Sequence, residues 1–146
     1  MPESKTTTLA ISRAAVAFIE RRGGRSNRGG GEFSRAAVVQ RTLMAYGALL
    51  QRCDPRKTSG LSEEMFRLAV ALLEEPWSLR PLEVEHLGET LGQSAGLEAA
   101  AKEAKVDREE FVKTIEALGF AEKMAIVDAS IQDQAPRAAG TIPEEF

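Results

Sequence analysis

Apolar residues near the start of the chain alternate with polar or small ones. Leu9 and Ile11 lie two positions apart in the β-branched segment 6–11, which predicts a short strand there. Leu9 also lies one heptad before Val16, a spacing that fits a helix as well. A single longer helix that begins near Ser4 therefore stays open as an alternative to the strand.

The spacing of apolar residues becomes helical farther along the chain. Ser12 is a suitable N-cap for a helix over about residues 13–22, which Gly23 and Gly24 would end. A basic, glycine-rich loop follows, and Ser34 is the expected N-cap of a second helix over about residues 35–52.

The rest of the chain is more continuously helical. A polar linker over residues 54–60 separates it from the first part. Helix-start signals are Ser62, Pro81 and the pair Asp107 and Glu110. They predict helices at about 63–75, 81–92, 97–104, 108–118 and 120–132.

These patterns predict a mainly α protein. The expected fold is a short N-terminal strand and two helices, followed by an acidic bundle of about four to five helices. The expected organisation is a basic segment at 1–53, the linker at 54–60, an acidic helical domain at 61–132 and a disordered tail at 133–146.

Charge divides the chain in the same way. Residues 1–60 carry eleven Lys and Arg against four Asp and Glu, whereas residues 61–146 carry eight against eighteen. Either the basic part binds an anionic partner, or the two parts attract each other within one fold. We weigh these two explanations equally.

Several classes of protein are disfavoured. Cys53 is the only cysteine, which indicates neither disulfides nor a zinc site, and the first eight residues do not form a secretory signal. No apolar run reaches the roughly 20 residues of a membrane span. We therefore expect a cytoplasmic protein without a membrane role.

Catalytic patterns are also missing. His86 is the only histidine, which excludes a Ser-His-Asp triad or a site with several histidines within one chain. Glu83 and His86 form one Glu-x-x-His motif, but di-iron bundles need two such motifs. We expect no enzyme, no metal and no cofactor.

The N-terminal third resembles the ribbon-helix-helix family of DNA-binding proteins, over about residues 5–52. In that family two chains pair their strands into a ribbon that enters the DNA major groove. The resemblance implies that Thr6, Thr8 and Ala10 face the bases. It also implies that Ser34 and Arg35 anchor a phosphate at the start of the second helix, where the helix dipole favours an anion. Arg25 and Arg28 would add positive charge beside that phosphate.

The family's buried second helix is matched by an apolar set in this chain. Three features depart from the family: Ala10 replaces a longer polar side chain, no proline ends the strand, and the loop 23–33 is long. They weaken the expectation of base-specific reading more than that of the fold. The matching apolar residues are Val38, Val39, Leu43, Tyr46 and Leu50.

The acidic part gives less specific signals. Residues 97–118 have a faint helix-turn-helix pattern, but three glutamates on the second helix oppose phosphate contacts, so plain bundle packing is the better interpretation. Trp77 is expected to be a core anchor, with an exposed interface position as the alternative.

The sequence therefore leads to two hypotheses of different classes. The first is a homodimeric DNA-binding regulator, of the repressor or antitoxin-like kind, whose acidic helices contact a protein partner. The second is a helical adaptor or structural interaction protein that does not bind nucleic acid.

Overall fold

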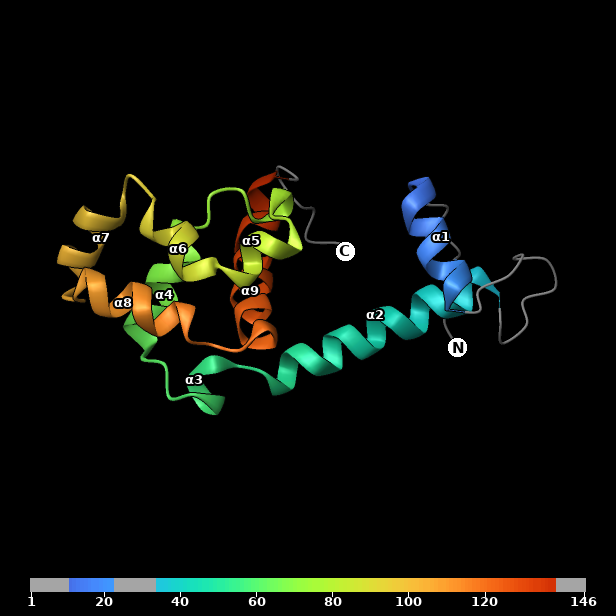
Figure 1. Ribbon diagram of the computed structural model, residues 1–146, viewed down its shortest axis with the longest axis horizontal. Coiled ribbons are helices and arrows are strands. Elements are labelled where there is room, and N and C mark those ends of the chain that lie inside the picture. Colours follow the sequence, from blue (N-terminus) through green and yellow to red (C-terminus); the bar gives the residue numbers. More distant parts are fainter. Residues whose placement is uncertain (1–10, 23–33, 139–146) are drawn as a thin grey trace. The chain divides into compact units, whose positions relative to one another are not determined.

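The chain is mainly helical, as predicted (Figure 1). The computed structural model describes residues 11–22 and 34–138, with side chains through residue 134. The chain forms two compact units, Met1–Gly47 (unit 1) and Ala48–Phe146 (unit 2). The division falls within one long helix rather than in the polar linker.

In unit 1, helix α1 spans Arg13–Arg21 and begins where the sequence predicts. The hydroxyl of Ser12 accepts a hydrogen bond from the backbone N–H of Ala15 at 3.2 Å, which satisfies one of the free donors of the first turn. The expected strand at 6–11 is not supported. Residues 6–10 lie outside the described residues, and Ile11, its described end, has no strand conformation.

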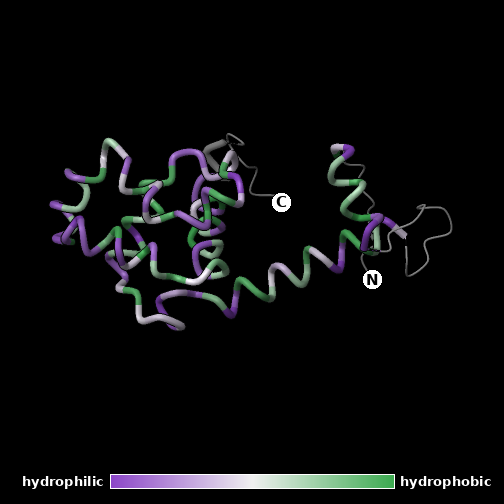
Figure 2. The backbone as a smooth tube through the Cα atoms, in the orientation of Figure 1, coloured by the Kyte–Doolittle hydropathy of each residue, from purple (hydrophilic) through white to green (hydrophobic). Residues whose placement is uncertain are grey.

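Helix α2, Arg35–Arg52, has the predicted bounds. Its expected N-cap is confirmed, because the hydroxyl of Ser34 accepts a hydrogen bond from the N–H of Ala37 at 3.1 Å. None of its 18 residues is buried, although hydrophobic residues recur along its whole length (Figure 2). Its large apolar residues Leu43 and Met44 are 63% and 68% exposed.

Unit 2 builds a core of its own. Helix α9, Phe120–Ala138, packs against α4, Glu63–Leu72, and the contact between α6, Leu87–Gly92, and α8, Arg108–Glu116, is the most extensive one. Helix α7, Leu97–Ala104, lies against both α4 and α8. The largest fully buried apolar side chains are those of Leu87, Leu91, Leu97, Phe111, Ile115 and Ile126.

Helix α4 ends three residues earlier than predicted. Pro76 begins a short 3-10 turn, η1 (Pro76–Ser78), and a proline disfavours helical backbone in the residue before it. The hydroxyl of Ser130 on α9 lies within hydrogen-bond distance of the carbonyls of Val70 and Leu73, at 3.3 and 3.1 Å, and the Val70 carbonyl also accepts from the N–H of Leu73. A partner from a distant helix thus satisfies this end, a contact that local sequence does not reveal.

The helix expected at 81–92 is two helices. Helix α5, Pro81–Glu85, stops at His86, whose backbone has φ −106° and ψ 41°, and α6 begins at the next residue. The hydroxyl of Thr90 donates to the carbonyl of His86 at 3.0 Å. The break turns α6 onto α8, which a straight helix would not reach.

Two segments that were expected to lack helices contain helical residues. The linker 54–60 contains a short helix, α3 (Pro55–Thr58), because Asp54 caps it and proline suits its first turn. The tail expected at 133–146 is helical as far as Ala138, where α9 ends, and Gln134 on this extension donates to the carbonyl of Leu73. Residues 139–146 lie outside the described residues.

Trp77 differs from its expected position in the core. Its side chain is 57% exposed, so it is not a core anchor. The leucines of α4 and α6 fill the core without it.

Gly88 of α6 should tolerate no larger residue. A Cβ atom at this position would lie 2.6 Å from the backbone N and Cβ of Glu116 and from the carbonyl oxygen of Val112. We expect Gly88→Ala to lower the free energy of unfolding by about 2–3 kcal/mol, since overpacking against backbone has no soft neighbour to displace. Chemical denaturation followed by circular dichroism measures the change.

Gly96→Ala is the matched control in unit 2. Its Cβ would meet only the Cδ2 atom of Leu72, at 3.9 Å, which is an ordinary van der Waals contact. Equal losses of stability in the two variants would contradict the close approach of α6 and α8.

Candidate functional site

Most of the residues predicted to touch DNA lie outside the described structure. These are Thr6, Thr8, Ala10, Arg25 and Arg28. Ser34 and Arg35 are the two predicted site residues that the structure describes.

Ser34 and Arg35 are engaged in contacts within unit 1. Ser34 is 6% exposed and its hydroxyl caps α2. The guanidinium of Arg35 forms an ion pair with the carboxylate of Glu20 on α1. A phosphate at this helix start would therefore meet backbone N–H groups and an arginine that already has a partner.

The described part of unit 1 is strongly basic. It contains five arginines and one carboxylate, that of Glu20. The guanidinium of Arg22 lies 4.3 Å from the centre of the Phe18 ring, a cation–π arrangement that holds it on the surface of α1. Among the described residues of this unit, the exposed arginines are Arg13, Arg21, Arg22 and Arg41.

Unit 2 contains a polar cluster that the sequence did not reveal. Nδ1 of His86, where α5 breaks, lies 3.0 Å from one carboxylate oxygen of Glu116 on α8. The other oxygen accepts a hydrogen bond from the backbone N–H of Glu89 at 3.0 Å. One carboxylate thus holds both sides of the break between α5 and α6.

Lys123 completes this cluster from α9. Its side chain is only 6% exposed, and Nζ donates to the carbonyl of Glu85 at 2.6 Å. Nζ also lies 4.0 Å from the Glu116 carboxylate. A buried ammonium is stable only with such partners, so the cluster ties α5 and α8 to α9.

The same contacts set the charge state of Glu116. Burial alone would raise its pKa, but hydrogen bonds from the N–H of Glu89 and from His86, together with the charge of Lys123, lower the pKa below its ordinary value. The carboxylate is therefore ionised at neutral pH.

The cluster has some of the geometry of a cation site. His86, Glu89 and Glu116 can each offer one ligand atom, and these atoms lie within 4.8 Å of one another. However, both oxygens of Glu116 already accept hydrogen bonds, and the ammonium of Lys123 would repel a metal ion. The contacts support a structural tie between helices.

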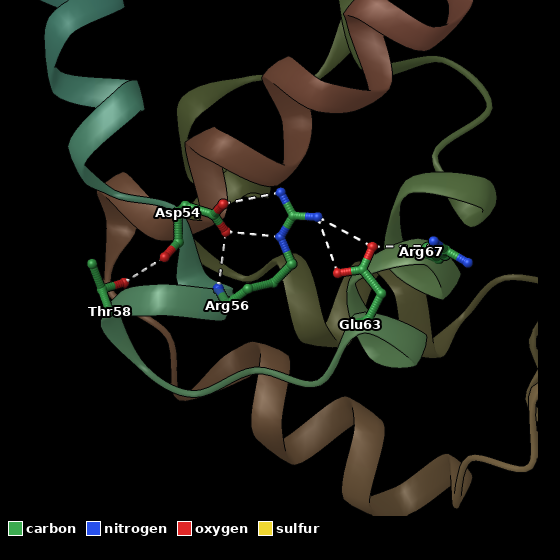
Figure 3. Close-up of polar contacts among 5 residues, drawn as sticks. All are labelled: Asp54, Arg56, Thr58, Glu63 and Arg67. Atoms are coloured by element: carbon green, nitrogen blue, oxygen red, sulfur yellow. Dashed lines mark hydrogen bonds and ion pairs between the residues drawn. The ribbon is translucent and has the colours of Figure 1, made fainter.

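A second polar network joins α3 to α4 (Figure 3). Arg56 donates two hydrogen bonds to the carboxylate of Asp54, at 3.0 and 2.9 Å, and two to that of Glu63, at 3.2 and 3.1 Å. Arg67 also donates to Glu63, at 3.2 Å. The guanidinium lies 4.0 Å from the centre of the Phe66 ring.

This network fixes the charge of its members. The hydrogen bond from Arg56 outweighs partial burial and lowers the pKa of Asp54. The pKa of Arg56 is raised in return. Because this charge is already balanced within unit 2, Arg56 adds little to the basic surface available to a partner.

A groove lies beside α4, η1 and α6. Apolar side chains line its floor, and Glu74, Glu75 and Glu83 supply carboxylates, while no Lys or Arg side chain is among the residues that line it. The carboxylate of Glu83 already forms an ion pair with Arg80 at 3.1 Å, so Glu74 and Glu75 are the carboxylates that favour a cationic group flanked by apolar ones.

Sequence reasoning placed Glu83 and His86 on one exposed helix and so missed the partners of His86. Those partners, Glu116 and Lys123, come from two later helices, and only the bundle brings them together. The one available signal was the isolated histidine within an acidic segment.

No helix in the described part of the chain has the length and apolar character needed to cross a membrane. Comparison with known proteins found no matching family model, no matching curated protein and no matching solved structure.

Glu116→Gln should weaken unit 2 in a pH-dependent way. We expect a loss of about 1–2 kcal/mol in the free energy of unfolding at pH 7, since hydrogen bonds to a charged group are lost. A lowered folded-state pKa stabilises the fold above the unfolded pKa of about 4.3, and this contribution disappears as the pH falls through the folded value. The difference from the wild type should therefore shrink in acid.

Urea denaturation between neutral and acidic pH tests this expectation. Glu103→Gln is the control, because Glu103 is an exposed residue on a different helix, α7. A Glu116→Gln difference that stays constant into acid would contradict an ionised tie.

Proposed function

We propose that the chain is a DNA-binding homodimeric regulator, of the repressor or antitoxin-like kind, that binds DNA through unit 1. The observation that carries this proposal is the exposed positive charge of that unit. The described part of unit 1 contains five arginines and only one carboxylate. Phosphate contacts of this kind supply affinity without reading sequence.

The helices of unit 1 support the ribbon-helix-helix form of this proposal. Helices α1 and α2 have the bounds that the resemblance requires. The apolar positions of α2 are unburied within one chain, as expected of a family in which two chains share one core. Base reading would then fall to Thr6, Thr8 and Ala10.

A second candidate is the helical adaptor. The observation that favours it is the acidic, apolar groove beside η1, with exposed Trp77 in the same turn. For an adaptor of this kind, the expected partner is a protein segment that carries a basic residue among apolar ones. Absence of DNA binding even at low salt would make this candidate the leading one.

Arg28→Ala should weaken binding to all DNA sequences alike. Loss of one phosphate contact should also reduce the slope of log affinity against log salt by about 1. Fluorescence anisotropy with the full chain and labelled double-stranded DNA, at several salt concentrations, gives both quantities. Lys102→Ala, an exposed cation in unit 2, is the matched control and should leave the slope unchanged.

Thr8→Ala should change the preference between DNA sequences instead. A threonine in the major groove contacts base edges or a thymine methyl group, so its loss costs about 1–3 kcal/mol at one base position. Competition between a selected site and scrambled DNA measures the ratio of affinities. If Thr8→Ala weakened binding to both DNAs equally, Thr8 would not read a base.

A further inference from the structure

We propose that the groove beside α4, η1 and α6 binds a small organic cation, an amine or guanidine attached to an apolar body. The groove lies in unit 2, and this role does not depend on DNA binding by unit 1. The occupant also differs from the protein segment of the second candidate function. Three properties of the groove carry the assignment: its leucine floor, its unpaired carboxylates and its size.

The floor of the groove is apolar and preformed. Leu73 and Leu91 are 4% and 2% exposed and belong to the core of unit 2. Leu72 and Leu79 line the groove too, and they pack against the same core while remaining partly buried. An apolar ligand group in the groove therefore covers leucines that the core already holds in place, so little ordering of the protein opposes binding.

The charges around this floor favour a cation. Glu74 and Glu75 are exposed, and within the described ranges no basic side chain forms an ion pair with either carboxylate. Glu83, in contrast, is paired with Arg80. Helix α4 ends at Leu72, so its carbonyl end, which has partial negative charge, also borders the groove.

The leucine floor determines which kind of cation fits. An exposed ion pair alone contributes little affinity, because water screens it, so the ligand must also cover leucine side chains. A bare metal ion cannot do so. The described residues with the spacing of metal ligands are His86, Glu89 and Glu116, and none of them lines the groove.

The size of the groove matches a small molecule. Its volume is about 450 Å³, within the range of roughly 300–1,000 Å³ that is typical of small-molecule sites. Eleven residues line it, whereas a stable protein interface uses roughly 20–30 residues on each side. A protein partner would need surface beyond the groove, but a small amine would not.

Titration of the full chain with phenylbutylamine, followed by amide NMR, tests the assignment. Phenylbutanol and phenylbutyrate are the matched neutral and anionic probes. We expect saturable shifts at the groove residues, with an affinity that falls from the amine to the alcohol to the acid. The indole N–H of Trp77, the only tryptophan, gives a separate signal from η1. Equal affinities for the three probes, or shifts that do not saturate, would overturn the proposal.

Glu74→Gln combined with Glu75→Gln tests the role of charge. We expect the dissociation constant of phenylbutylamine to rise about fivefold and that of phenylbutanol to stay unchanged. Glu98→Gln combined with Glu109→Gln is the matched control, because both glutamates are exposed and lie outside the groove. Equal weakening of amine and alcohol by the first pair would contradict a cation site, since a general change of structure affects both probes.

Ser94→Phe tests the space in the groove. Ser94 lines the groove between α6 and α7, so a phenyl ring there should take the place of the ligand and weaken amine binding at least about tenfold. Circular dichroism should show an unchanged helical signal. Undiminished binding by a folded Ser94→Phe variant would place the amine elsewhere and overturn the assignment.

Two further measurements separate this inference from the proposed functions. A short peptide with one arginine among leucines represents the protein partner, and binding of this peptide without binding of phenylbutylamine would replace the small cation by the second candidate. DNA binding is followed separately by fluorescence anisotropy. Its absence would contradict the proposed DNA-binding function alone, whereas absence of amine binding would contradict the groove assignment alone.

Discussion

The structure of unit 2 depends on the close approach of α6 to α8 at Gly88. With no Cβ, Gly88 lets the backbone of α6 reach the start of the last turn of α8, and any side chain there would collide with Glu116 or with the carbonyl of Val112. That approach requires the break at His86, because a continuous helix from residue 81 would point elsewhere. It also brings the Glu116 carboxylate to the N–H of Glu89. This hydrogen bond stabilises the break between α5 and α6, and the break in turn allows α6 to pack against α8.

The two units differ in how many apolar side chains they bury. Unit 2 buries leucines, Phe111 and Ile126 from most of its helices, and it buries Lys123 only with a carbonyl and a carboxylate beside it. In unit 1, the described helices bury one apolar residue, Ile19, while Leu43 and Met44 of α2 stay exposed. The described part of unit 1 therefore has far less buried apolar surface than unit 2.

The sequence predicted those features whose causes are local. Ser12, Ser34 and Asp107 cap their helices through hydrogen bonds within three residues, and these starts are correct. Errors arose where a distant partner decides the outcome. Ser130 stabilises the early end of α4, α8 draws α6 away from α5, and Gln134 holds an extension of α9 that composition alone predicts to be disordered.

For the candidate site, too, the sequence predicted local features and missed those that depend on distant partners. Charge asymmetry could be read directly, because it needs only the positions of Arg and Glu in the chain. The tie between His86, Glu116 and Lys123 could not, because its members are separated by 30 residues and 7 residues along the chain and belong to the bundle, not to a motif. The exposure of Leu43 on α2 could not be predicted either, because its helical spacing is equally typical of a helix that packs into a core.

In the proposed homodimer, the basic charge of unit 1 opposes dimerisation and favours DNA at the same time. Two copies brought together concentrate arginines that repel each other, and a phosphate backbone that runs across both copies removes this repulsion. DNA then binds the dimer more tightly than the monomer, and by linkage it must tighten the dimer by the same factor. The acidic unit 2 strengthens this coupling, because its net negative charge is repelled by phosphates and favours an orientation in which unit 1 alone faces the DNA.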